Sequence, residues 1–133
     1  MKLEKLIKRN IEAVTSFKIE TDIIKISSNK IYAGEHWRKR KKLKDNYLFL
    51  TNSFKTLPKL DFKVNLYFSF YFKKNALDSS NCFYMAKILE DCLVHHQVLQ
   101  DDTVKYVGQV SCESKKGNKD YCVITIDRYK QNI

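Results

Sequence analysis

Five carboxylates gather in a region of the chain that has almost no basic residues. Between positions 78 and 102 the acidic residues are Asp78, Glu90, Asp91, Asp101 and Asp102, and the single lysine or arginine is Lys87. Hard cations such as Mg²⁺ prefer carboxylate oxygens as ligands. A bound metal can activate water and offset charge on a phosphate, and a nearby lysine can stabilise developing negative charge. The region is a candidate site for metal-dependent phosphodiester cleavage.

The same residues also have simpler structural interpretations. Asp78 precedes a predicted helix and could cap it. Asp101 and Asp102 could be turn residues before a strand. Asp91 lies four residues after Lys87, so the two share a helix face and could form a surface ion pair. Taken one at a time, these residues leave both interpretations open.

A dense basic segment, RKRKKLK at residues 38–44, has six basic residues in seven. On a helix these side chains point all round, so several can reach a phosphate backbone together. Such a density of like charge repels itself, which favours a polyanionic partner over a solvated helix end. Trp37, just before the segment, and Tyr32 in the preceding loop add flat surfaces that could stack or simply pack.

The composition limits the class of protein. The chain has 133 residues, a net charge of +10 and 44% hydrophobic residues, which fits one domain with a core and excludes a disordered basic tail. Residues 1–60 hold 15 Lys/Arg against 6 Asp/Glu, whereas residues 61–133 hold 10 against 9. Such an excess suits a polyanion. No apolar run approaches the roughly 20 residues that span a bilayer, and the N-terminus lacks a secretory pattern. We expect a cytoplasmic protein with no membrane partner.

The cysteines and histidines carry weaker signals. None of the four cysteines forms a CxxC pair, so free thiols are predicted rather than zinc ligands or disulfides. Cys112 and Cys122 flank a predicted hairpin and could be neighbours. His95 and His96 adjoin a helix end, where a charge partner for the helix dipole is expected.

Hydrophobic periodicity predicts one small α+β domain with a mixed or antiparallel sheet packed with helices. Apolar residues at helical spacing predict helices over 2–14, 36–54 and 80–96. β-rich or alternating segments predict strands over 17–26, 61–72, 104–112 and 120–128. Residues 27–35 are predicted to be a loop. The SKKGNK segment predicts a hairpin turn in which Gly117 and Asn118 take positive φ.

The stretch LDSSNCFYMAKILEDCLVHHQVLQDDTVKYV (77–107) resembles the core of the RusA family of Holliday-junction resolvases, especially its phage-type members. The family has an acidic segment ending in Asn, a helix with a lysine and an Asp one turn later, and an Asp-Asp pair that leads into a strand. Here these correspond to Asp78 through Asn81, Lys87 with Asp91, and Asp101-Asp102. Residues 28–47 resemble the family's Asn-containing loop and basic helix. The resemblance covers roughly residues 17–127, so residues 1–15 are expected to be a helical extension of a nuclease domain at 16–133.

The resemblance implies a homodimeric α+β nuclease that uses Mg²⁺, with Mn²⁺ as a substitute, to cut four-way DNA junctions in a bacterial cell or phage-infected host. Branched DNA is the implied partner. The implied catalytic residues are Asp78, Lys87, Asp91 and Asp102. The implied metal ligands are Asp78, Asp101 and Asp102. The implied DNA-binding residues are Asn29, Lys30, Tyr32, Trp37, Arg38, Lys39, Arg40, Lys41, Lys42 and Asn81.

The sequence departs from the family pattern at Ser80, where the family has a second aspartate just before the Asn. The helix also gains three residues between Asn81 and Lys87. An uncharged serine is a weaker metal ligand than a carboxylate. Three alternatives follow: Asp91 or Asp101 completes the metal site, activity persists with weaker metal binding, or the protein binds junctions without cutting them. An RNA-binding accessory protein that uses the same basic helix is a further alternative.

Overall fold

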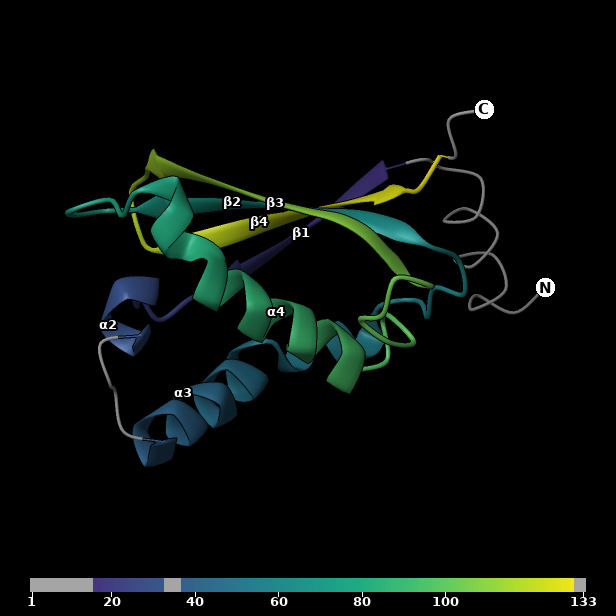
Figure 1. The fold of residues 1–133 in the computed structure, drawn as a ribbon, viewed down its shortest axis with the longest axis horizontal. Helices are drawn as coiled ribbons and strands as arrows, with labels where there is room; N and C mark the ends of the chain where they lie inside the picture. The colour runs from purple at the N-terminus through teal and green to yellow at the C-terminus, as the bar shows by residue number, and fades with distance from the viewer. Residues whose placement is uncertain (1–15, 33–36, 131–133) are drawn as a thin grey trace.

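The computed structural model describes residues 16–32 and 37–130, which form a two-layer α+β domain (Figure 1). The elements in chain order are β1 (Ser16–Asp22), α2 (Ser28–Tyr32), α3 (Trp37–Leu50), the 3-10 helix η1 (Asn52–Thr56), β2 (Val64–Phe72), the 3-10 helix η2 (Ser79–Cys82), α4 (Phe83–His95), β3 (Val107–Lys116) and β4 (Tyr121–Arg128). The predicted α+β class is confirmed. The helix predicted over 2–14, and with it the proposed extension, lies outside the described residues.

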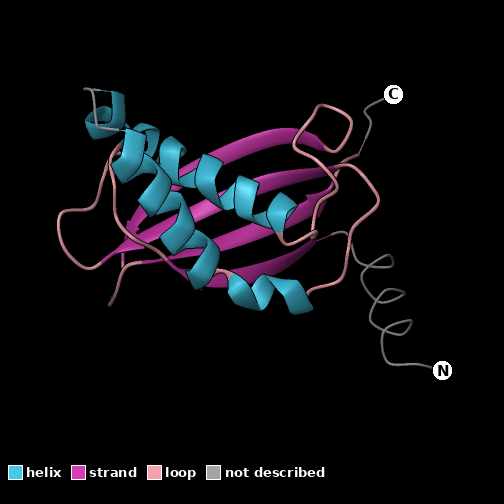
Figure 2. Cartoon of the chain, turned by 90° about the horizontal axis from the view of Figure 1, so that it is seen from below, coloured by secondary structure: helices cyan, strands magenta, loops and turns pink. Residues whose placement is uncertain are grey.

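The four strands form one mixed sheet in the order β1-β4-β2-β3. Strand β2 pairs antiparallel with β4 and parallel with β3, and β1 pairs antiparallel with β4. Parallel neighbours need a long crossover, and the segment that contains α4 supplies it. Helices α3 and α4 cover the same face of the sheet (Figures 1 and 2). The acidic region at 78–102 therefore crosses one face of the sheet between two paired strands.

Strand β2 is central because its sequence buries one face completely. Val64, Leu66, Phe68 and Phe70 are at most 1% exposed, and Phe72 is fully buried. Of the alternate side chains on the other face of the sheet, Asn65, Tyr67 and Tyr71 are half-buried and Ser69 is buried. This period-two pattern, as predicted, places the core between β2 and the helices.

The predicted hairpin between the last two strands is wrong, because β2 lies between β3 and β4. Strand β2 takes both of them as hydrogen-bonded neighbours, which satisfies its backbone on both sides. Gly117 donates its backbone N–H to the Phe72 carbonyl, and a side chain there would meet the Tyr71 Cβ at 2.9 Å. The positive φ predicted for Gly117 and Asn118 is wrong, since neither residue takes one, and the close approach of Tyr71 explains the glycine instead.

The four cysteines are free, as predicted. Cys112 on β3 and Cys122 on β4 do not lie on neighbouring strands, since β2 lies between β3 and β4. Burial raises the pKa of the Cys82 thiol to about 11 and that of Cys112 to about 12. These thiols are therefore protonated at neutral pH and belong to the packed interior.

The segment predicted as a loop at 27–35 contains the short helix α2. Tertiary hydrogen bonds hold it there. The Ser28 hydroxyl donates to the Asn81 carbonyl at 3.1 Å and accepts the Tyr84 N–H at 3.0 Å. A buried serine thus ties α2 to the start of α4. Local propensity gave no sign of this helix because its partners lie more than fifty residues away.

Strand β1 ends at Asp22, four residues before the predicted end. Among the strands that the structure describes, it pairs with β4 alone, whose first residue, Tyr121, faces Asp22. Beyond that point the chain leaves the sheet and contacts α3, where the buried Tyr47 hydroxyl donates to the Ile24 carbonyl at 2.6 Å. The apolar residues after Asp22 therefore belong to the helix layer rather than to the sheet.

Candidate active site

Helix α4 carries a charged face opposite its buried face. Met85, Leu89 and Leu93 are fully buried on the predicted apolar stripe. Glu90 and Asp91 lie three and four residues after Lys87, which places the three side chains on one side of the helix. The helix thereby brings one cation and two carboxylates together.

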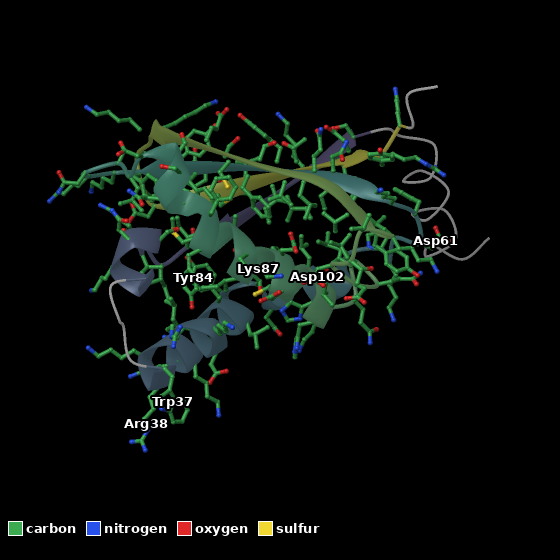
Figure 3. All side chains as sticks on the ribbon, viewed as in Figure 1. Trp37, Arg38, Asp61, Tyr84, Lys87 and Asp102 are labelled. Carbon is green, nitrogen blue, oxygen red and sulfur yellow. The ribbon has the colours of Figure 1, made fainter. Side chains whose placement is uncertain are left out.

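A third carboxylate reaches this face from the loop before β3. The Lys87 Nζ lies 2.6 Å from the Asp102 Oδ2, 3.3 Å from the Asp91 Oδ1 and 3.4 Å from the Glu90 Oε1. Figure 3 shows Lys87 on α4 directed toward Asp102. We call Lys87, Glu90, Asp91 and Asp102 the Lys87 cluster. The cluster brings together Lys87 and Asp102, which the family resemblance implies are catalytic and which lie fifteen positions apart in the sequence.

The loop that carries Asp102 is anchored at both ends. Val98 and Leu99 are buried, and their backbone N–H groups donate to the Leu93 carbonyl. The N–H groups of Tyr106 and Val107 both donate to the Thr103 carbonyl at 2.9 Å. These bonds fix the path of the chain on either side of Asp102, so its carboxylate is held near α4.

Asp101 takes the structural role that the sequence left open. Its Oδ1 accepts the backbone N–H of Asp102 at 2.8 Å, and its side chain is exposed. Asp101 thus shapes the turn that presents Asp102. Its role as a metal ligand stays a prediction.

The electrostatics of the cluster favour the charged forms of its central pair. The hydrogen bond to Asp102 raises the pKa of the Lys87 ammonium, and the hydrogen bond and charge of Lys87 lower the pKa of the Asp102 carboxyl. Both shifts have the direction expected for an ion pair. At neutral pH Lys87 is therefore a protonated ammonium and Asp102 an ionised carboxylate.

Glu90 is the cluster member for which no role was predicted. Its side chain is only 9% exposed, and burial raises the pKa of its carboxyl while Lys87 opposes this rise. A desolvated acid beside a cation is a common feature of functional sites. Its position three residues after Lys87 was the available signal, but nothing in the sequence indicated its burial.

Asp78 and its neighbours lie at the other end of the motif. Asp78 immediately precedes η2, and its carbonyl accepts the Asn81 N–H at 2.9 Å, while its side chain is exposed and makes no capping hydrogen bond. Ser80 is exposed as well. Within the described residues no ion pair connects Asp78 with Lys87. The Asn81 backbone holds α2, so this residue has a structural function besides its predicted contact with DNA.

The predicted DNA-binding helix is α3, and its basic residues are exposed. These are Arg38, Lys39, Arg40, Lys41 and Lys42. Trp37 begins the helix with 57% of its surface exposed, and the Arg38 guanidinium lies 5.5 Å from the centre of its ring. Asn29 and Lys30 are exposed on α2, and the Tyr32 side chain lies outside the described part of the structure.

His96 does not act as the predicted charge partner at the end of α4. Its ring is 8% exposed, and its Nε2 lies 3.1 Å from the buried Thr51 hydroxyl. Burial lowers the pKa of the imidazole, which favours the neutral form. His96 is therefore a packing residue that joins α4 to the end of α3, whereas His95 remains exposed at the last position of α4.

The donor chemistry of the Lys87 cluster suits a hard cation, because carboxylate oxygens are its only other charged groups. In the present arrangement the Lys87 ammonium lies among the three carboxylates. Across residues 16–32 and 37–130, no group of three or more His, Cys, Asp and Glu side chains is arranged to hold a metal ion. A divalent cation at Asp102 would compete with Lys87 for the same oxygens.

A scan against models of protein families finds no match, and no curated protein matches the chain in sequence. Among the described helices, none has both the length and the apolar character needed to cross a membrane.

Proposed function

We propose that this protein is a metal-dependent endodeoxyribonuclease of the RusA type that resolves four-way DNA junctions during recombination, repair or phage DNA processing. The observation that carries the proposal is the 2.6 Å contact between Lys87 and Asp102. These residues come from two separate motifs of the resemblance, and an anchored loop holds one against a helix that holds the other. A lysine kept charged beside a carboxylate suits phosphodiester chemistry.

Three residues of the Lys87 cluster have a defined part in the proposed reaction. Lys87 offsets the negative charge that develops on the scissile phosphate. Asp102 orients the Lys87 ammonium and offers a ligand for Mg²⁺ or Mn²⁺, together with Asp91 or Asp101. When bound, the metal supplies an activated water and neutralises phosphate charge. Asp78 is proposed as a further ligand that DNA or a second subunit draws toward the cluster.

The basic helix α3 is the proposed contact with the DNA backbone. Its exposed cations neutralise phosphates and release counterions, so binding should weaken steeply with salt. Two copies of the active site are needed for paired incisions in a two-fold symmetric junction, which makes a homodimer the proposed assembly. The site of action is the cytoplasm of a bacterial or phage-infected cell.

The test is incubation of the purified protein with a synthetic four-way junction and Mg²⁺ or Mn²⁺. We expect symmetric nicking that Asp102→Asn abolishes while junction binding is preserved. Asp61→Asn is the matched control, since Asp61 is an exposed loop residue outside the Lys87 cluster (Figure 3). Intact junction binding with no cleavage in either metal would refute the nuclease proposal.

A junction-binding protein without catalysis is the second candidate function. Two observations favour it: Ser80 stands where the family pattern has a carboxylate, and the Lys87 ammonium already contacts all three carboxylates of the cluster. Under this function Asp102→Asn leaves junction affinity intact or raises it, and there is no cleavage to lose. Ser80→Asp separates the two candidates further, because gain of cutting would show a site that lacks one ligand.

A further inference from the structure

A groove between α3 and α4 combines basic and aromatic side chains. Its volume is about 340 Å³, and it is lined by Trp37, Arg40, Lys41 and Lys44 from α3 and by Tyr84 from the first turn of α4. In Figure 3 Trp37 lies at the end of α3 and Tyr84 on α4, on the same side of the molecule. Lys44 and Tyr84 lie within the stretches 28–47 and 77–107, but no role was predicted for either residue from the sequence.

The lining defines the chemistry of the ligand. Three cations in one groove attract phosphate, and the exposed ring of Trp37 with the half-buried ring of Tyr84 offers flat apolar surface. Aromatic rings beside a basic track are the usual means by which proteins hold unpaired bases. A duplex would offer the groove only its backbone, whereas a single strand offers phosphate and base together.

A smaller hollow extends the groove along the seam between the helices. It has a volume of about 130 Å³ and shares Lys44 with the first groove. Asp91 and His95 line its other side, and Asp91 contacts Lys87 at 3.3 Å. The groove and the hollow together therefore run from the aromatic rings toward the Lys87 cluster. The volume of the first groove, about 340 Å³, is at the lower end for small-molecule pockets, which suits one nucleotide.

We propose that the groove binds an unpaired nucleotide of a DNA strand, with the base against Trp37 and Tyr84 and its phosphates on Arg40, Lys41 and Lys44. The inference rests on the proposed function only in taking the strand to be DNA. At a branch point such a nucleotide is available where pairing is interrupted. Capture of this nucleotide would make the protein selective for branched over continuous duplex DNA.

Trp37 is the only tryptophan of the chain, so its fluorescence reports on the groove alone. The protein is titrated at fixed low salt with a short oligothymidylate and with an abasic deoxyribose-phosphate strand of equal length and charge. Stacking should quench Trp37 with the thymidylate strand and leave it bright with the abasic strand. We expect affinity for the abasic strand to be at least about 5-fold weaker. Equal quenching and equal affinity would overturn the proposal.

Matched variants separate the groove from the general charge of the protein. Lys41→Gln should weaken binding of the thymidylate strand about 5-fold. Lys116→Gln removes the same charge from an exposed residue of β3 outside the groove and should weaken binding less than about 2-fold. Tyr84→Leu keeps apolar bulk, so it should reduce the preference for thymidylate over the abasic strand. Equal effects of the two lysine variants, or an unchanged preference in Tyr84→Leu, would refute the groove.

The outcomes also separate this inference from the nuclease proposal. Cleavage of junctions without quenching of Trp37 would refute the groove alone. Quenching without cleavage in Mg²⁺ or Mn²⁺ would refute the nuclease alone and support the groove. Tighter binding of oligouridylate than of oligothymidylate would overturn the assignment of the strand as DNA.

Discussion

Replacement of Lys87 by methionine tests whether the cluster depends on its central ammonium. The variant keeps the length of the side chain but leaves Glu90, Asp91 and Asp102 without their shared cation. Two unit charges about 6 Å apart repel by about 0.7 kcal/mol in water, and the three carboxylates form three such pairs. Because Lys87 exposes 54% of its side chain, solvent screens part of this effect. We expect a loss of about 1–2 kcal/mol in unfolding free energy at pH 7.5.

The pH dependence of this loss has a defined sign. The pKa of Asp102 is lowered in the folded protein, so its attraction to Lys87 contributes stability above the unfolded pKa and is lost as the pH falls through the folded pKa. Glu90 has a raised pKa and becomes protonated earlier in the same titration. As the carboxylates take up protons, their repulsion in the variant disappears. The deficit of Lys87→Met should therefore shrink below about pH 4.

Urea unfolding at pH 7.5 and at about pH 3 measures this difference. At the higher pH we expect the melting temperature of the variant to be lower by about 3–10 °C. Lys116→Met is the matched control, because Lys116 is an exposed lysine of β3 outside the cluster. Millimolar Mn²⁺ should raise the melting temperature of Lys87→Met more than that of the original protein, since the released carboxylates can bind it. The same deficit at both pH values, or an equal deficit in Lys116→Met, would refute the reasoning.

Three further substitutions test contacts away from the cluster. Burial lowers the pKa of His96, so protonation favours the unfolded state, and the free energy of unfolding should fall as the pH drops below about 6.5. His96→Gln can still form a hydrogen bond with Thr51 and should flatten this pH dependence in urea titrations. Tyr47→Phe removes the hydroxyl that bonds the Ile24 backbone, and should cost about 1–3 kcal/mol by thermal unfolding. Gly117→Ala puts a methyl group 2.9 Å from a tyrosine Cβ, and should cost about 1–3 kcal/mol, with a near-neutral result excluding this steric explanation.

Local patterns predicted the elements well where burial alone determines them. The alternation of β2 and the stripe of Met85, Leu89 and Leu93 on α4 gave the correct faces, because each pattern repeats against one core. Pairing of strands depends on distant partners, and the sequence between β3 and β4 suited a hairpin that the sheet does not contain. Helix α2 was missed for the same reason, since Ser28 finds its partners at Asn81 and Tyr84.

At the candidate site, too, local spacing predicted some contacts, and others depend on segments that are distant in the sequence. Helical spacing placed Lys87 beside Asp91, and their 3.3 Å contact confirms it. Spacing could not reveal that Glu90 is buried, since that depends on how the loop carrying Asp102 packs against α4. Asp78 belongs to the same motif, yet the whole first turn of α4 and η2 separate it from Lys87 along the chain.

The pairing of β1 with β4 joins the first and last strands of the described chain, with Ser16 opposite Asp127. This closes the longest loop in the sheet, and closure entropy grows with loop length. Among the described strands β1 has one hydrogen-bonded neighbour and β2 has two, so fewer of these contacts oppose the release of β1. Its amides should exchange with solvent through a partial opening that leaves β2, α4 and the Lys87 cluster folded. The adjacent strand ends also suit circular permutation, with a short linker from Arg128 to Ser16 and new termini in the exposed connection at Lys74 and Asn75.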